Sequence, residues 1–253
     1  FTIVALAATL VIHVSPWITK GFGYSTDGYN GAMWGLGARG AIEDPIGNRL
    51  GGVHPSGYRY ANHPPLLVWT TAVTGGLTDE RPVALRAPAL LASLVALLLL
   101  AALLRDAGFG LGEIAGGLAV AGTSAMFLTY GAMLDTPVLS LPFGLAAIGA
   151  AQRAWQGRPP PAPVLVIAGL LAALAGWQSL LAVVVGAALT LCSPSTDGRR
   201  AGRILGAGAA AGLAITLAWI AWVKGTLLAL GDQAAYRAGI DTAAFRSKSW
   251  DEF

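Results

Sequence analysis

The chain has 253 residues, of which 55% are hydrophobic and only 11% are charged, with a formal net charge of +3 and a mean hydropathy of +0.63. About 25% of the residues of a soluble domain are charged, so this composition excludes an ordinary soluble protein and indicates an integral membrane protein. The small net charge gives no support for nucleic-acid binding, and the single cysteine, Cys192, excludes an internal disulfide and a cysteine-based metal site.

Apolar segments, taken in chain order, predict an all-α, polytopic membrane protein. A run of about 18 apolar residues is typical of a transmembrane helix, and about 20 are needed for a straight span. The candidate spans, several of them shorter than this, are residues 1–17, 83–104, 111–130, 137–151, 162–176, 180–192 and 204–223. The apolar segment 66–77 is too short to span comfortably, so we expect an interfacial or re-entrant helix there.

The placement of basic residues supports a topology of about seven spans. Arginine and lysine favour the cytoplasmic side of short loops. If segment 66–77 does not span, one group of arginines falls on the cytoplasmic side: Arg105, Arg153, Arg158, Arg199, Arg200 and Arg203. The sequence therefore predicts a membrane module over residues 1–223 with one external polar loop, residues 19–82. Residues 224–253 are expected to form an external tail that continues in a longer protein.

The external loop concentrates the ionisable and aromatic side chains of the chain. Within it, residues 29–41 place apolar residues beside glycines and one arginine, which fits a short amphipathic helix lying in the membrane interface. Tyrosine and tryptophan also gather at membrane–water boundaries, so most of the aromatic rings here are interpreted as interfacial anchors. If the chain has a reaction site, this loop is expected to carry it.

Four short motifs lie in a fixed order along the chain. They are the acidic tetrad STDG containing Asp27, the HPPL motif beginning at His63, the RAP motif beginning at Arg86, and the MLDTP motif containing Asp135. In order and spacing they resemble those of the GT-C membrane glycosyltransferases. They are most similar to the branch of the protein O-mannosyltransferases and of the bacterial transferases that attach aminoarabinose to lipid A. The resemblance covers about residues 1–180.

This resemblance implies a polytopic helical enzyme in the bacterial cytoplasmic membrane, with its active site on the external face. Such enzymes move a sugar from a polyprenyl-phosphate donor to an acceptor, which here is an unidentified protein, lipid or glycan. The family's catalytic acid corresponds to Asp27, and a second acid that helps to hold a metal or substrate corresponds to Asp135. Most relatives have two adjacent acids at the first position, where this chain has Asp27 and Gly28.

The chemistry of glycosyl transfer gives these residue types roles. A base must take the proton of the acceptor hydroxyl, and a partly desolvated carboxylate such as Asp27 has a pKa raised toward the working pH. Cationic or hydrogen-bonding groups must stabilise the leaving phosphate, for which the planar guanidinium fork is well suited. Arg86 and His63 are the first candidates for substrate binding, and Arg59 and Arg81 follow. Gln178 interrupts an apolar run on the external side and is a further candidate.

Each of these residues also has a structural interpretation. Asp27 and Asp135 both suit a helix N-cap, the latter with Pro137 just inside the helix, and His63 precedes a Pro-Pro turn that restricts its backbone. Whether a cofactor binds stays open, since a divalent cation could be shared by Asp27 and Asp135. A non-catalytic lipid-binding or partner subunit on the same scaffold is the main alternative function. A transporter is less favoured, because the spans contain almost no charge and no convincing repeat.

Overall fold

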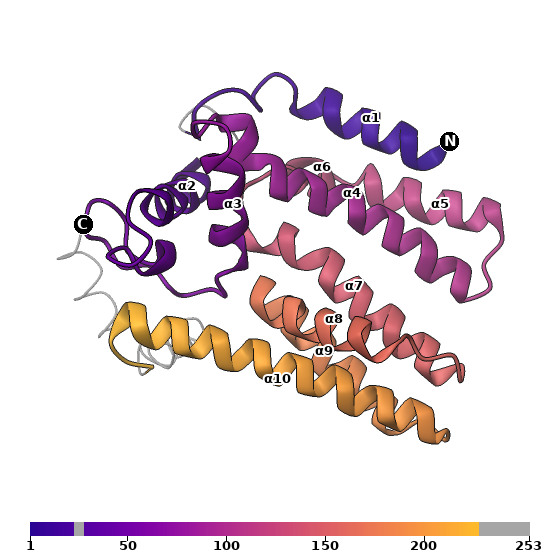
Figure 1. Ribbon diagram of the computed structural model, residues 1–253. Helices are drawn as coiled ribbons and strands as arrows, with labels where there is room; N and C mark the ends of the chain where they lie inside the picture. The colour runs from indigo at the N-terminus through magenta and orange to yellow at the C-terminus, as the bar shows by residue number, and fades with distance from the viewer. Residues whose placement is uncertain (23–27, 228–253) are drawn as a thin grey trace, which may run out of the picture.

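The computed structural model describes residues 1–22 and 28–227, and every regular element in these ranges is a helix (Figure 1). The longest helices are α4 (Pro82–Asp106), α7 (Thr136–Trp155) and α10 (Thr196–Lys224). The other helices that run with them are α1 (Thr2–Val14), α5 (Leu111–Gly122), α6 (Ala125–Tyr130), α8 (Ala162–Ala175) and α9 (Trp177–Leu191). The polar region contains α2 (Gly28–Glu43), the 3-10 turn η2 (Arg49–Gly51) and α3 (Leu66–Gly76).

The long helices lie side by side in a bundle, and α2 and α3 gather at one end of it (Figure 1). We call this the loop end; it holds α2, η2, α3, the first turns of α4, α7 and α9, and the last turn of α10. The opposite end, which we call the arginine end, holds the connections α4–α5, α7–α8 and α9–α10. There the Arg153 side chain at the end of α7 pairs with Asp106 at the end of α4.

Local sequence signals account for where the main helices begin and end. The α7 helix begins after Asp135, whose carboxylate caps it, with a proline in its first turn. The Ser195 hydroxyl caps α10 by accepting the backbone N–H of Gly198 at 2.9 Å. At its other end α10 stops at Gly225, whose φ of 77° is the left-handed conformation that glycine adopts without strain.

The predicted helical segments agree with the observed ones, with two corrections. Residues 111–130 were expected to form one span, but they form α5 and α6, separated by a break at Thr123 and Ser124. The Thr123 hydroxyl bonds back to the Ala119 carbonyl, and Ser124 begins a new helix by accepting the N–H of Phe127. The expected segment 204–223 begins earlier than predicted, because α10 starts at Thr196.

Length and hydropathy together separate two helices from the rest. Among the described helices, α4 and α10 are long and apolar enough to cross a membrane by length and composition. The apolar helices α1, α3, α5, α8 and α9 have 10 to 17 residues, so each is shorter than the ~20 residues of a straight span. Helical structure is therefore established, while a count of seven spans goes beyond what helix length alone supports.

Glycines allow α8 and α10 to pack at very short range. A Cβ atom added to Gly169 in α8 would overlap the carbonyl oxygen of Leu205, and one added to Gly208 in α10 would overlap that of Val166. Small residues at such crossings let two helix backbones approach closely, as is common between helices in membranes. This packing ties α10 to the bundle along much of its length.

The polar region is held on the bundle by hydrogen bonds from side chains to backbone carbonyls. Trp219 in α10 donates its indole N–H to the carbonyl of Arg49 at 3.0 Å. In return Arg49 donates Nη1 to the carbonyls of Trp222 and Val223 at 2.6 and 2.8 Å. Lys224 donates to the carbonyl of Arg59 at 2.9 Å. These bonds join residues more than 160 positions apart and fix the loop against the end of α10.

Candidate functional site

A cavity of about 680 Å³ lies among α4, α5, α6 and α7, and it begins at the loop end. Its polar wall is formed by Asn30, Tyr130 and Asp135, with Ser93 and Ser124 farther along. The rest of the wall is apolar and includes Leu97, Leu100, Phe127, Leu141 and Leu145. The cavity is therefore amphipathic, with a carboxylate and an amide at one end and hydrocarbon along most of its length.

Asp135 is placed in this cavity by two sets of contacts. One carboxylate oxygen, Oδ1, accepts the backbone N–H of Thr136 at 2.7 Å, as an N-cap does. The other, Oδ2, accepts a hydrogen bond from Asn30 Nδ2 in the first turn of α2 at 3.2 Å. The turn before Asp135 is fastened to α4, because the buried Ser93 hydroxyl donates to the Gly131 carbonyl at 2.6 Å. The half-buried carboxylate thus joins α2 to α7, and the Ser93 bond ties the preceding turn to α4.

The pair of Asn30 and Asp135 can recognise a ligand rich in hydroxyl groups. A carboxylate only accepts hydrogen bonds, whereas a primary amide both donates and accepts them. Sugar hydroxyls do both, so the two side chains together match that chemistry. Each oxygen of Asp135 has further lone pairs beyond the bonds that it already makes. The helix-capping interpretation of Asp135 is confirmed, and it leaves room for a ligand.

The position of Asp27, the proposed base, lies outside the described residues. Its distance from Asp135, and hence a metal ion shared by the two carboxylates, stays a prediction. Within residues 1–22 and 28–227, no group of three or more His, Cys, Asp or Glu side chains is arranged to hold a metal ion. The described part of the site contains one carboxylate, that of Asp135, and one amide, that of Asn30.

Arg86 is buried near the start of α4 and is not among the residues that line the cavity of Asp135. Its side chain is 0% exposed, and Nη1 donates to the carbonyls of Ile18 and Lys20 at 2.9 and 2.8 Å. The guanidinium lies 4.5 Å from the ring centre of Phe22 and 5.5 Å from that of Trp17. Arg86 therefore fastens the segment after α1 onto the start of α4, and its role in substrate binding stays a prediction.

The other expected substrate-binding residues of the loop do not line the cavity beside Asp135. The His63 ring packs edge-on against Trp34 with ring centres 5.9 Å apart, and it lies 6.2 Å from the ring of Tyr60. Arg59 and Arg81 are exposed, the latter just before α4. In this structure the HPPL motif ends the loop and begins α3, since Pro65 is the residue that precedes that helix.

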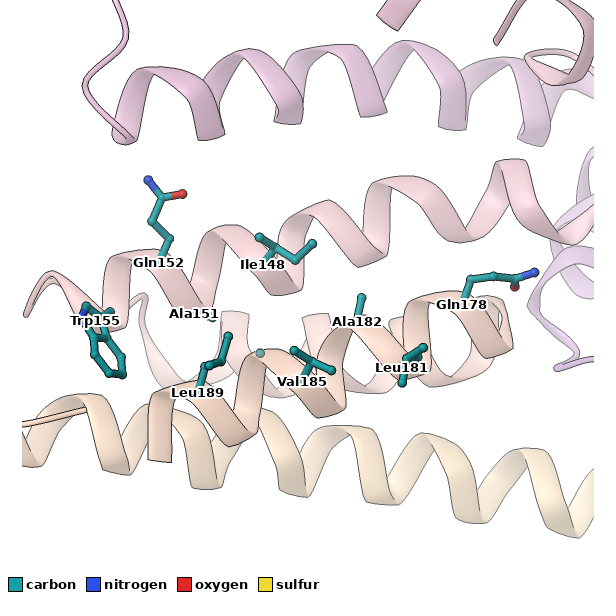
Figure 2. Close-up of a pocket in the computed structure, with 10 residues that line it drawn as sticks. Ile148, Ala151, Gln152, Trp155, Gln178, Leu181, Ala182, Val185 and Leu189 are labelled. Carbon is teal, nitrogen blue, oxygen red and sulfur yellow. The ribbon is translucent and has the colours of Figure 1, made fainter. Parts of the chain in front are cut away.

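Gln178 lines a second space, which is separate from the cavity of Asp135. This groove has a volume of about 590 Å³ and runs between α7 and α9. Figure 2 shows Gln178 at one end of it and Trp155 at the other, with Ile148 and Val185 between them. Asp135 and Gln178 were predicted to belong to one site. Asp135, at the start of α7, lines the first cavity, whereas Gln178, in α9, lines the groove between α7 and α9.

The loop also buries His54, for which the sequence indicated no interaction partner. The backbone N–H of His54 donates to the backbone carbonyl of Tyr58 at 2.8 Å, and the ring centres of the two residues lie 5.5 Å apart. Its side chain is buried, and Nδ1 has no hydrogen-bond partner in the part of the chain that the structure describes. Burial lowers the pKa of His54 below its ordinary value, because the charged form loses its hydration. His54 is therefore held as a neutral imidazole.

Sequence reasoning missed Asn30 and Tyr130 as cavity residues. Asn30 lies in a stretch interpreted only as an interfacial helix, and Tyr130 lies at the end of a segment interpreted as one span. The available signal was position: Asn30 lies two residues after the acidic tetrad, and Tyr130 lies five residues before Asp135. The Asn30 amide lies close after the STDG motif and the Tyr130 phenol close before the MLDTP motif. Both side chains line the polar wall of the cavity.

Comparison with known proteins adds no relative. No protein-family profile, curated protein sequence or solved structure matches this chain.

Proposed function

We propose that the chain is a membrane glycosyltransferase of the GT-C type. It would transfer a sugar from a polyprenyl-phosphate donor to a hydroxyl acceptor at the external membrane face. The observation that supports this most directly is the cavity of Asp135, which combines a hydrogen-bonding end with an apolar length between helices. A polyprenyl-linked sugar has the same division, with a hydroxyl-rich group at one end and hydrocarbon at the other.

The proposed topology has seven spans, and helix arrangement and charge support it. The bundle helices run between the loop end and the arginine end (Figure 1), and α3 stays at the loop end. Helices shorter than a straight span are accommodated where the bilayer thins locally or neighbouring helices cover them. The short connections at the arginine end carry six arginines, and basic residues in short loops favour a cytoplasmic position. In the proposed topology the loop end and Asp135 therefore lie outside. The module over residues 1–223 belongs to this proposal.

In the proposed reaction, Asp135 and Asn30 hold hydroxyl groups of the donor sugar, and Asp27 is the base. The acceptor oxygen loses its proton to the Asp27 carboxylate and forms a bond to the anomeric carbon. The bond from that carbon to the phosphate oxygen breaks, and its electron pair leaves with polyprenyl phosphate. The apolar wall of α4, α6 and α7 holds the first part of the polyprenyl chain. A divalent cation shared by Asp27 and Asp135 is the variant of this mechanism that stays open.

The test is a transfer assay with the purified protein in lipid nanodiscs. The donors are polyprenyl-phosphate mannose and polyprenyl-phosphate aminoarabinose, each labelled in the sugar, with native membrane extract as acceptor. Asp135→Asn keeps the helix cap, because asparagine caps as well as aspartate, but removes the charge that binds sugar hydroxyls. We expect it to reduce transfer by about 10- to 100-fold, the value of one or two hydrogen bonds to a charged group.

The matched control is Asp106→Asn, a carboxylate at the arginine end, which is expected to leave transfer unchanged. Equal activity of the Asp135→Asn variant and the unaltered protein would contradict the proposed site. Donor binding without release of polyprenyl phosphate from either donor would instead favour the non-catalytic lipid-binding subunit. That alternative has an observation of its own, since both oxygens of Asp135 already serve structural contacts.

A further inference from the structure

The cavity of Asp135 has one charged side chain in an otherwise neutral wall. Among the described residues that line it, no lysine, arginine or histidine accompanies the Asp135 carboxylate. The groove between α7 and α9, and a further space of about 600 Å³ among α3, α4 and α7, have no ionisable side chain in their described walls. A negative charge therefore distinguishes this cavity from the other two.

The Asp135 carboxylate is held by neutral groups. At the arginine end the Asp106 carboxylate pairs with the Arg153 guanidinium. Asp135 instead accepts the backbone N–H of Thr136 at 2.7 Å and the side-chain amide of Asn30 at 3.2 Å, and it forms no salt bridge in the part of the chain that the structure describes. A half-buried carboxylate beside hydrocarbon is stabilised by a cation that takes its remaining lone pairs.

Hydrocarbon begins directly beside this charge. The wall residues that α4 and α7 contribute recur at helical spacing, so that each set lies on one face of its helix: Ser93, Ala96, Leu97 and Leu100 on α4, and Val138, Leu141 and Leu145 on α7. From Asp135 to Leu145 the α7 helix rises about 15 Å, at 1.5 Å per residue. The wall therefore suits an extended apolar chain whose polar end lies at Asp135.

A primary ammonium fits the polar end better than the other small polar groups. It carries a positive charge and three N–H donors, for which the Asp135 carboxylate and the amide oxygen of Asn30 are acceptors. Hydrogen bonds between charged partners are about twice as strong as those between neutral ones. A hydroxyl group could donate to the same atoms, but without the charge. An anionic group in that place would be repelled by the carboxylate.

We infer that the cavity of Asp135 binds single-chain amphiphiles whose polar end is a protonated primary amine joined directly to hydrocarbon. The ammonium lies at Asp135 and Asn30, and the chain lies along α4 and α7. The inference rests on the proposed function only in using the same cavity. Its argument is the charge of the wall, which holds with or without sugar transfer.

The test is equilibrium binding of radiolabelled decylamine to the protein in nanodiscs of dioleoyl phosphatidylcholine, with binding to empty nanodiscs subtracted. At neutral pH this amine is protonated, as the lysine side chain is. We expect saturable binding, from which decanol displaces the amine at least about tenfold less effectively than unlabelled decylamine does. Asp135→Asn should weaken binding by a similar factor and abolish the discrimination between amine and alcohol. Equal displacement by the two compounds, or unchanged binding by Asp135→Asn, would overturn the inference.

Two matched controls test the location. Leu141 and Ile148 both belong to α7 and are each 44% exposed, but Leu141 lines the cavity of Asp135 and Ile148 lines the groove between α7 and α9. Leu141→Trp should lower decylamine binding several-fold, and Ile148→Trp should leave it unchanged. Asp106→Asn, which removes a carboxylate at the arginine end, should also leave it unchanged. The same loss from both members of either comparison would contradict binding in this cavity.

Binding and transfer are measured separately, so the two proposals can fail independently. A protein that transfers sugar but binds decylamine no better than decanol would keep the proposed function and overturn this inference. A protein without transfer from either donor that binds decylamine through Asp135 would keep the inference and lose the reaction.

Discussion

The two ends of the bundle use their polar side chains in different ways. At the loop end, buried or half-buried side chains reach across the sequence to backbone carbonyls, as Arg86 does to Ile18 and Trp177 does to Asn62. At the arginine end, the side chains are more exposed and many of their bonds are local, such as that of Arg158 to Gln156. The first arrangement fixes several distant segments to one another, whereas at the arginine end the bonds across the sequence are fewer, such as those of Arg153 and Gln156 to Asp106. A site that must hold a substrate in one geometry is expected at the loop end.

Replacing Arg86 is expected to lower the stability of the protein more than any other substitution proposed here, and it tests whether the two ends differ. Arg86→Ala leaves two part-buried carbonyls, those of Ile18 and Lys20, without their charged donor, and it leaves a space beside Trp17 and Phe22. The free energy of unfolding should fall by about 3 kcal/mol or more. The measurement is unfolding of the protein in detergent micelles, by denaturant or by heat.

The control for Arg86 is Arg153→Ala at the arginine end. The side chains of Arg153 and Asp106 are 46% and 24% exposed, and an exposed pair contributes about 0 to 1 kcal/mol. Similar small losses in the two variants would show that the ends do not differ in this way. Arg86→Lys adds a further distinction, because it keeps the charge and loses the guanidinium fork. An anchoring role predicts lower stability, whereas a phosphate-binding role alone predicts lower activity at unchanged stability.

Two tryptophans on α10 sharpen the comparison within one helix. Trp219 is 4% exposed and donates to the Arg49 carbonyl, whereas Trp222 is 42% exposed. Trp219→Phe keeps an aromatic ring but removes the donor, so the free energy of unfolding should fall by about 1 kcal/mol. Trp222→Phe should change it by less than about 0.5 kcal/mol. Equal effects would mean that the bond to the loop contributes little.

The smallest expected effect is a pH dependence that originates in His54. Because burial lowers its pKa in the folded protein, the unfolded chain takes up the proton first as the pH falls below about 6.5. The contribution of His54 to stability is therefore constant above that pH and declines below it, until the folded form is protonated as well. Melting temperatures of the unaltered protein and of His54→Leu, compared between pH 7.5 and pH 5.5, measure this difference. A fall of the same size in both would exclude His54 as the source.

Much of the fold could be predicted from sequence, because apolar runs and helix caps are local signals. The start of α7 was readable from Asp135 and Pro137, and α3 from its short apolar run after two prolines. The break between α5 and α6 was not predicted, although Gly122, Thr123 and Ser124 follow one another there within the apolar run. There the competition is between side-chain hydroxyls and the helical backbone.

The site was harder to predict than the fold, because it depends on contacts between distant segments. Asp135, which was predicted for the site, lines the cavity, but its partner Asn30 is 105 residues away and no local pattern joins them. Gln178 was assigned to the same site by its place at a helix break, and the structure directs it to another space. For Arg86, the sequence could not distinguish a phosphate ligand from an anchor, since both require the same side chain.

Cysteine accessibility in intact cells tests most directly the central claim that the two ends lie on opposite sides of a membrane. The exposed Cys192 already lies at the arginine end, and Ser56→Cys in a Cys192→Ser background places a thiol on the exposed part of the loop. We predict that a membrane-impermeant maleimide labels the loop cysteine in intact cells, and labels Cys192 only after the membrane is permeabilised. Labelling of both cysteines, or of Cys192 alone, in intact cells would contradict the account.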